Sequence, residues 1–247
     1  MHADAFATPP EAPPVSETVE VLEAQSGLYT LLGRCIESEV DADLLGLLRG
    51  ALGDAVGEIG LDLGADVMNA PERQVLHTLA EEYTSLFVAP GAASPFRSVF
   101  ESGRLFQTQA DLAAAAYREA GFAFRNVHSG EFADHIGVML TFVGRLLGLE
   151  AEALRDGDAD AAAGWRARRE RFLLRQLAPW AVGWCRRARA CARHDFYRAI
   201  LDIVERTVWE DASAIADVKT LKRLVAANKR PLMRPKSDPE FRKASGL

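Results

Sequence analysis

The sequence lacks features that several classes of protein require. An uncharged apolar run of about 18 residues, which a membrane-spanning helix needs, is absent from the 247 residues. The chain has only three cysteines, Cys35, Cys185 and Cys191, and no Cys-x-x-Cys pair. We therefore expect neither a disulfide framework nor a structural zinc site. So few cysteines suit a reducing compartment, and we expect the protein to be cytoplasmic.

Motifs for catalysis and metal binding are scarce as well. The five histidines form no His-x-x-x-His or comparable pair, and neither a Walker-type phosphate loop nor a nucleophile elbow is present. Asp134 and His135 are neighbours, but adjacent residues on a helix point about 100° apart and do not face each other. We therefore expect no catalytic residues, no bound metal and no cofactor, so the protein is not expected to be an enzyme.

The two ends of the chain differ in composition from the rest. Residues 1–14 contain no Lys, Arg or apolar core of a secretory signal, and four of them are proline. We expect this segment to be a disordered Pro-rich tail. Residues 228–247 are basic and polar, and we expect a flexible C-terminal tail there. Residues 15–227 are then expected to form one folded domain.

Charge is distributed unevenly along the chain, although the net charge is only −6. Residues 11–66 carry twelve acids and two bases, whereas residues 166–193 carry nine arginines and one acid, Glu170. Two interpretations are open: two solvated helix faces that attract each other, or an acidic surface for a basic peptide. The acidic pI of about 5.5 argues against a nucleic-acid partner.

Helical spacing of apolar residues predicts an all-α fold, a single globular domain of about ten helices. No segment alternates with period two for long enough to predict a strand. Asp41 is expected to cap a second helix, and Ser129 to cap one that runs to about Leu147. Ser213 is expected to cap a last helix through Val225. Further helices are expected near residues 72–87, 98–106, 108–119, 165–177, 179–192 and 195–209.

Two segments have compositions that suit a binding site. In the first, Tyr83–Phe87 precedes a Pro-Gly loop and the segment Ser94–Ser98, so an apolar helix end meets a loop made rigid by prolines. In the second, Glu131–Gly137 places two acids and an imidazole at a helix start. The alternative for the first is ordinary core packing plus a turn, and for the second it is compensation of the helix dipole.

The order of these motifs resembles a known family. Tyr-x-x-Leu-Phe, a Pro-Gly loop, Pro-x-x-Ser and Glu-x-x-Asp-His-Ile-Gly are similar to motifs of the TorD/DmsD/NarJ group of redox-enzyme maturation chaperones. The later segments Leu177–Trp180 and Asp195–Ile200 are similar to that family's Leu-x-Pro-Trp and Phe-Tyr segments. The resemblance extends over residues 19–210.

The resemblance implies an all-helical, TorD-like chaperone that is not an enzyme. Such proteins bind the twin-arginine signal peptide, or a neighbouring segment, of a molybdopterin-dependent oxidoreductase before export or assembly. The implied partners are the molybdoenzyme catalytic subunit and its signal peptide, and the protein itself could be a monomer or a homodimer. The residues expected to bind the peptide are Tyr83, Leu86, Phe87, Pro95, Phe96, Ser98, Glu131, Asp134 and His135. The apolar members would form a ledge, Glu131 and Asp134 would face the arginines, and His135 would orient the loop or donate to a peptide carbonyl.

Two alternatives come from other classes of protein. One is a generic helical adaptor that binds a partner helix, and the other is a helical enzyme that depends on a nucleotide or a metal. Selectivity for peptides with an arginine pair separates the chaperone from the adaptor. A metal-rich purified protein or a saturable hydrolysis activity would favour the enzyme.

Overall fold

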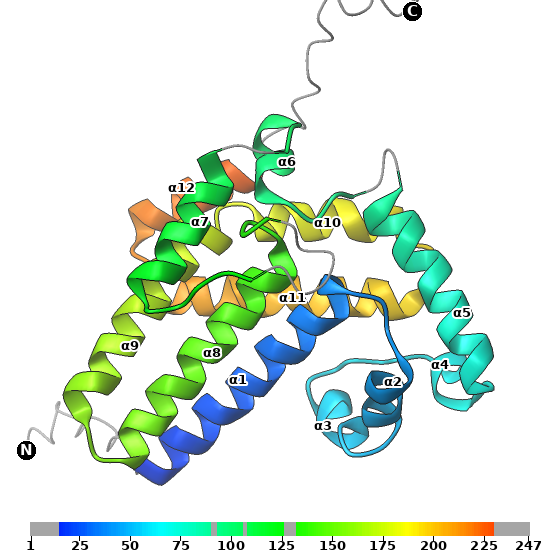
Figure 1. Ribbon diagram of the computed structural model, residues 1–247, viewed down its shortest axis with the longest axis horizontal. Helices are drawn as coiled ribbons and strands as arrows, with labels where there is room; N and C mark the ends of the chain where they lie inside the picture. Colours follow the sequence, from blue (N-terminus) through cyan, green and yellow to red (C-terminus); the bar gives the residue numbers. More distant parts are fainter. Residues whose placement is uncertain (1–14, 90–92, 106–107, 126–131, 230–247) are drawn as a thin grey trace, which may run out of the picture.

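A computed structural model describes residues 15–89, 93–105, 108–125 and 132–229 of the chain. Within these ranges the regular structure is helical, and the β-type pairing is a single isolated bridge between Phe96 and His135. The all-α expectation is therefore confirmed. None of the described helices is long and apolar enough to cross a membrane. The helices, shown in Figure 1, are α1 (Val15–Glu37), α2 (Ala42–Arg49), α3 (Gly53–Glu58), α4 (Ala65–Asn69), α5 (Glu72–Tyr83), α6 (Arg97–Ser102), α7 (Thr108–Glu119), α8 (Ile136–Arg155), α9 (Ala159–Phe172), α10 (Ala181–Cys191), α11 (Asp195–Ile215) and α12 (Val218–Asn228).

Helices α1 and α8 lie side by side in Figure 1, and glycines allow their close approach. A Cβ atom on Gly33 would lie 2.4 Å from Thr141 Oγ1, and one on Gly144 would lie 2.7 Å from Thr30 Oγ1. The hydroxyl of Ser26 donates a hydrogen bond of 2.8 Å to the carbonyl of Gly144 across the same contact. Side chains larger than hydrogen at these glycines would force the two backbones apart.

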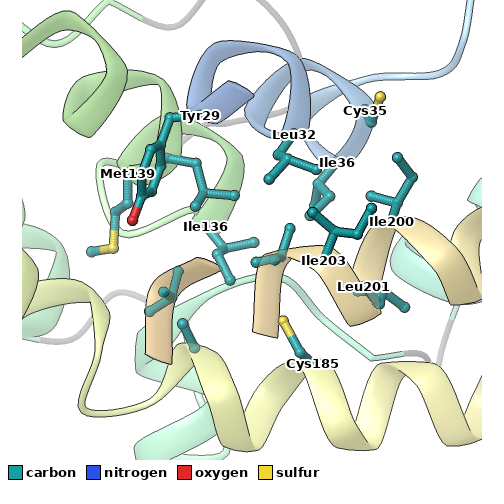
Figure 2. Packing of buried hydrophobic residues seen from close by; sticks show 14 of the residues in the cluster. Tyr29, Leu32, Cys35, Ile36, Ile136, Met139, Cys185, Ile200, Leu201 and Ile203 are labelled. Atoms are coloured by element: carbon teal, nitrogen blue, oxygen red, sulfur yellow. The ribbon is translucent and has the colours of Figure 1, made fainter. Parts of the chain in front are cut away.

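One hydrophobic core joins the long helices. Figure 2 shows Leu32 and Ile36 of α1 facing side chains of α8 and α11, and Cys185 of α10 approaching from the other side of α11. Tyr29 is buried in the same core, and its hydroxyl donates a hydrogen bond of 2.8 Å to Asp211 of α11. Helices from the first and last thirds of the chain therefore share one interior.

The helix starts agree with expectation at some positions and differ at others. Asp41 caps α2, because its Oδ1 accepts a 2.8 Å hydrogen bond from the Leu44 amide. Ser129 lies outside the described residues, and α8 begins later than expected, at Ile136, with His135 as its N-cap. The expected cap at Ser213 is wrong, because that residue lies within α11 and Asp217 caps α12. Apolar periodicity continues past Trp209 through the core-facing Ala212, and α11 ends six residues later than expected, at Ile215.

Two helices end in a π-helical turn. Segment η1 (Thr84–Val88) follows α5, and η2 (Leu173–Leu177) follows α9. In η2 the Ala178 amide donates a 2.8 Å hydrogen bond to the Leu173 carbonyl, five residues back. The wider turn comes directly before Pro179, whose ring would clash with the carbonyl four residues earlier in a regular α-helix.

Candidate functional site

The two motif segments that the sequence singles out pair with each other. The Ile136 amide donates a 2.9 Å hydrogen bond to the Pro95 carbonyl, and the Arg97 amide donates one of 3.1 Å to the Asp134 carbonyl. This short antiparallel pairing joins the start of α6 to the start of α8. We call these paired segments, 94–98 and 132–136, the motif junction.

Asp134 lies inside the junction, not on its surface. Its side chain is fully buried, and Oδ2 accepts a 2.8 Å hydrogen bond from the Ser98 amide in the first turn of α6. Ser98 is buried beside it. The Asp134 carboxylate therefore supplies the acceptor that the start of a helix lacks, and it fixes α6 to α8. Glu131, the other expected acid, lies outside the described residues.

His135 is the N-cap of α8. Its Nδ1 accepts a 3.1 Å hydrogen bond from the Gly137 amide, which requires that this nitrogen carry no proton. Burial lowers the pKa of the imidazole to about 3. The ring also meets Phe96 edge to face at a centroid distance of 5.0 Å. His135 therefore acts as a neutral, apolar-packed cap in this arrangement.

The expected apolar residues mostly support the junction from within. Tyr83, Leu86 and Phe87 are buried, and the Phe87 ring stacks on Trp184 at 5.9 Å. The indole of Trp184 in turn donates a 2.9 Å hydrogen bond to the Ser94 carbonyl. Pro95 is buried as well. Among the expected residues that the structure describes, Phe96 is the one that is partly exposed, and it meets the half-buried Phe132 at 5.7 Å.

An apolar groove that sequence reasoning missed lies next to the junction. It has a volume of about 380 Å³. We call it the aromatic groove, and its walls include Glu37, Tyr117, Phe122, Phe124, Val138, Thr141, Phe142 and Arg145. The Tyr117 hydroxyl donates a 2.7 Å hydrogen bond to the Ala133 carbonyl, which ties the groove to the junction. The sequence signal for this groove was three aromatic residues within eight positions, Tyr117, Phe122 and Phe124. Gly121, between them, has a φ of +85° in the structure.

The charges around the groove are of both signs. Burial raises the pKa of Tyr117, and the negative charges of Asp134 and Glu37 raise it further. The two carboxylates therefore act on the same wall of the groove. Arg145 is paired with Glu152 at 3.4 Å, and Arg125 is exposed. An apolar cleft with a carboxylate in its wall suits a chain that carries both apolar side chains and cations.

Comparison with known proteins assigns the family. The family model described as "Nitrate reductase delta subunit" matches residues 45–186, more than half of the chain. The matched range includes the motif junction and most of the aromatic groove. None of the curated proteins is similar enough to the chain to count as a relative. On the strength of the family match, the chain belongs to the nitrate reductase delta subunit family, a family of molybdoenzyme maturation chaperones.

Proposed function

We propose that the protein is a cytoplasmic chaperone that binds the twin-arginine signal peptide of a molybdopterin-dependent oxidoreductase, or a segment next to it. It would hold the apoenzyme during maturation without catalysing a reaction. The observation that carries the proposal is the aromatic groove beside the motif junction. A signal peptide combines an arginine pair with an apolar run, and the groove offers apolar walls together with the carboxylate of Glu37, beside Arg125 and Arg145.

Burial of the apolar run would supply most of the binding free energy. Apolar surface removed from water contributes about 25 cal/mol per Å², less the cost of ordering a flexible peptide. A charge-assisted hydrogen bond from a peptide arginine to Glu37 would add affinity and set the register. Glu131 is proposed as a second partner for the arginine pair.

The residues of the motif junction are proposed to act mainly by positioning. Asp134 and His135 fix the starts of α6 and α8, and Tyr83, Leu86 and Phe87 support the same region from the core. Phe96, which is partly exposed, is the member of the set proposed to touch the peptide. A rigid groove binds more tightly because less ordering is needed at the moment of binding.

The test is fluorescence polarisation with a labelled peptide that contains an Arg-Arg pair followed by an apolar run. Phe124→Ala should weaken binding about tenfold, because a large aromatic contact is lost. Glu37→Gln should weaken binding about threefold to tenfold, since a charge-assisted bond becomes a neutral one. The matched control is Leu47→Ala, which changes an exposed apolar residue on α2 away from the groove. This variant should bind within about twofold of the wild type, as expected for a surface position.

The peptide is varied in parallel. Replacing Arg-Arg by Gln-Gln in the peptide should weaken its binding to the wild type. The same replacement should weaken binding to the Glu37→Gln variant by a smaller factor. Equal binding of an amphipathic helical peptide without arginines would support the generic adaptor. Unchanged affinity of both groove variants would show that the peptide binds elsewhere.

A further inference from the structure

The tertiary structure neutralises most of the arginine-rich segment, residues 166–193. Arg166 and Arg169 pair with the buried Glu150 at 2.7 and 3.1 Å. Arg186 and Arg193 pair with Glu205 and Glu82 respectively, and Arg189 pairs with both Asp202 and Glu205. These carboxylates lie outside residues 11–66. In these contacts the arginine-rich segment therefore pairs with carboxylates from later parts of the chain, and not with those of the acidic N-terminal helices.

Three of the four other arginines of this segment lie at a second groove. Arg168, Arg171 and Arg175 are exposed, and they line a cavity of about 240 Å³ whose other walls include residues of α7. Arg171 reaches Glu119 at 4.0 Å, but both side chains are more than half exposed, so this pair contributes little. Arg168 and Arg175 form no ion pair with a described carboxylate. We call this cavity the arginine groove.

The floor of the arginine groove is apolar. Phe142 and Phe172 form its base, and the small side chains of Ala115 and Ala116 on α7 leave it open. At its rim, Leu112 is 46% exposed. Phe142 also lines the aromatic groove, so the two grooves are neighbours.

The spacing of the arginines indicates what kind of anion fits. Arg168 and Arg175 are seven residues apart, which corresponds to about 10 Å along a helix axis. A single phosphate requires donors that converge on one point, whereas these three form a row. A row of cations beside an apolar floor matches a chain that carries several carboxylates between apolar side chains. Such complementarity of charge gives a binding partner its register and raises its rate of association.

We propose that the arginine groove binds an acidic polypeptide segment in which carboxylates alternate with apolar side chains. This goes beyond the proposed function, because it is a second contact surface, for a different segment of a partner polypeptide. A partner polypeptide would then be held at two places, by an apolar and cationic segment in the aromatic groove and by an acidic segment in the arginine groove.

The experiment uses the full chain and a labelled peptide of Glu and Leu residues, with a matched peptide in which Gln replaces Glu. The triple variant Arg168→Gln, Arg171→Gln, Arg175→Gln should bind the acidic peptide about tenfold or more weakly, as expected for several surface charge pairs lost together. The control triple is Arg73→Gln, Arg104→Gln, Lys222→Gln, which removes the same charge at exposed positions outside the groove. It should bind within about twofold of the wild type, since distant surface charges are screened. Leu112→Gln, which keeps every charge, should weaken binding about threefold through lost apolar contact.

Three outcomes would contradict the proposal, and each can be told from the others. Equal affinity of the wild type for the Glu and Gln peptides would overturn the proposal, as would equal losses in the two triple variants. Tighter binding of inorganic tripolyphosphate than of the Glu peptide, dependent on the three arginines but not on Leu112, would overturn it in favour of a phosphate-bearing ligand. Phe124→Ala should leave binding of the acidic peptide unchanged. Failure of the proposed signal-peptide function would thus be seen separately from failure of this inference.

Discussion

At the residue scale, the polar side chains of the motif junction are structural groups with buried hydrogen bonds. Asp134 accepts from Ser98 and His135 accepts from Gly137, so each satisfies an amide at the start of a helix. Buried polar groups of this kind contribute stability only while their partner is present. Their effects on ligand binding must therefore be separated from their effects on folding.

Asp134→Ala should lower the free energy of unfolding by about 1–3 kcal/mol, because the buried Ser98 amide loses its acceptor. Asp134→Asn keeps an acceptor oxygen at the same place and should lose less. Urea denaturation followed by tryptophan fluorescence measures both. If Asp134→Ala were as stable as the wild type but bound the signal peptide poorly, the carboxylate would contact the ligand directly. The double variant Glu131→Gln, Asp134→Asn would then be the next test of the two acids as arginine partners.

His135 makes stability depend on pH in a defined direction. Its folded pKa of about 3 lies below the ordinary value of 6.5, so the unfolded chain takes up the proton first as pH falls. The stability that the neutral His135 provides is complete above about pH 6.5 and is lost progressively toward about pH 3. At pH 5 the loss should amount to about 2 kcal/mol.

The measurement compares urea denaturation of the wild type and of His135→Asn at pH 7, 6 and 5. Asparagine can also cap a helix but does not titrate, so stability of this variant should fall less between pH 7 and pH 5. His77→Asn, at an exposed position of α5, is the control for replacing a histidine away from the motif junction. Equal slopes for His135→Asn and the wild type would contradict the role given to His135.

At the element scale, the close contact of α1 with α8 positions Glu37 beside the start of α8. A Cβ atom on Gly137 would lie 2.9 Å from both the backbone nitrogen and the Cβ atom of Glu37. The last turn of α1 therefore packs directly on the first turn of α8, next to the motif junction. The glycines of this contact matter because they let the two helices approach closely, not because they adopt backbone angles that other residues avoid.

Two glycines of α1 provide a matched test of this contact. Gly33→Ala should destabilise the protein by about 1–3 kcal/mol, because the new methyl group would overlap atoms of α8. Gly27→Ala should instead stabilise it by about 0.5–1 kcal/mol, since nothing lies within 4 Å of its Cβ position and alanine is the better helix former. Thermal and urea denaturation of both variants measure the difference. A stabilising Gly33→Ala would mean that α1 and α8 do not pack this closely.

At the scale of the whole molecule, one core carries two neighbouring grooves of different character. The aromatic groove and the arginine groove lie on either side of Phe142, which packs against Tyr117 and Phe172 at 4.6 and 4.7 Å. The consecutive helices α7, α8 and α9 contribute their walls together with α1, which is distant in sequence. The two peptide experiments proposed above therefore test a property of the assembled molecule, not of any single helix.

The sequence by itself determined the helical class, the positions of many helices and the resemblance of its motifs to those of one family. Apolar spacing and cap residues such as Asp41 act over a few neighbours, so local chemistry is enough to locate α2 or α7. Local chemistry was insufficient at Ser213, where the buried Ala212 and the wider core kept α11 helical past a residue that could have been a cap.

Only the tertiary structure decided which polar residues face inward and which arginines have a carboxylate partner. Asp134 looks like a surface acid in the sequence, but its amide partner Ser98 comes from another segment, and the pairing buries it. Arg166 and Arg168 are two residues apart, yet the first meets the buried Glu150 of α8 and the second lines an open groove. The physical reason is the same in both cases: burial and ion pairing depend on neighbours that are distant in the chain, and their positions exist only after the helices have packed.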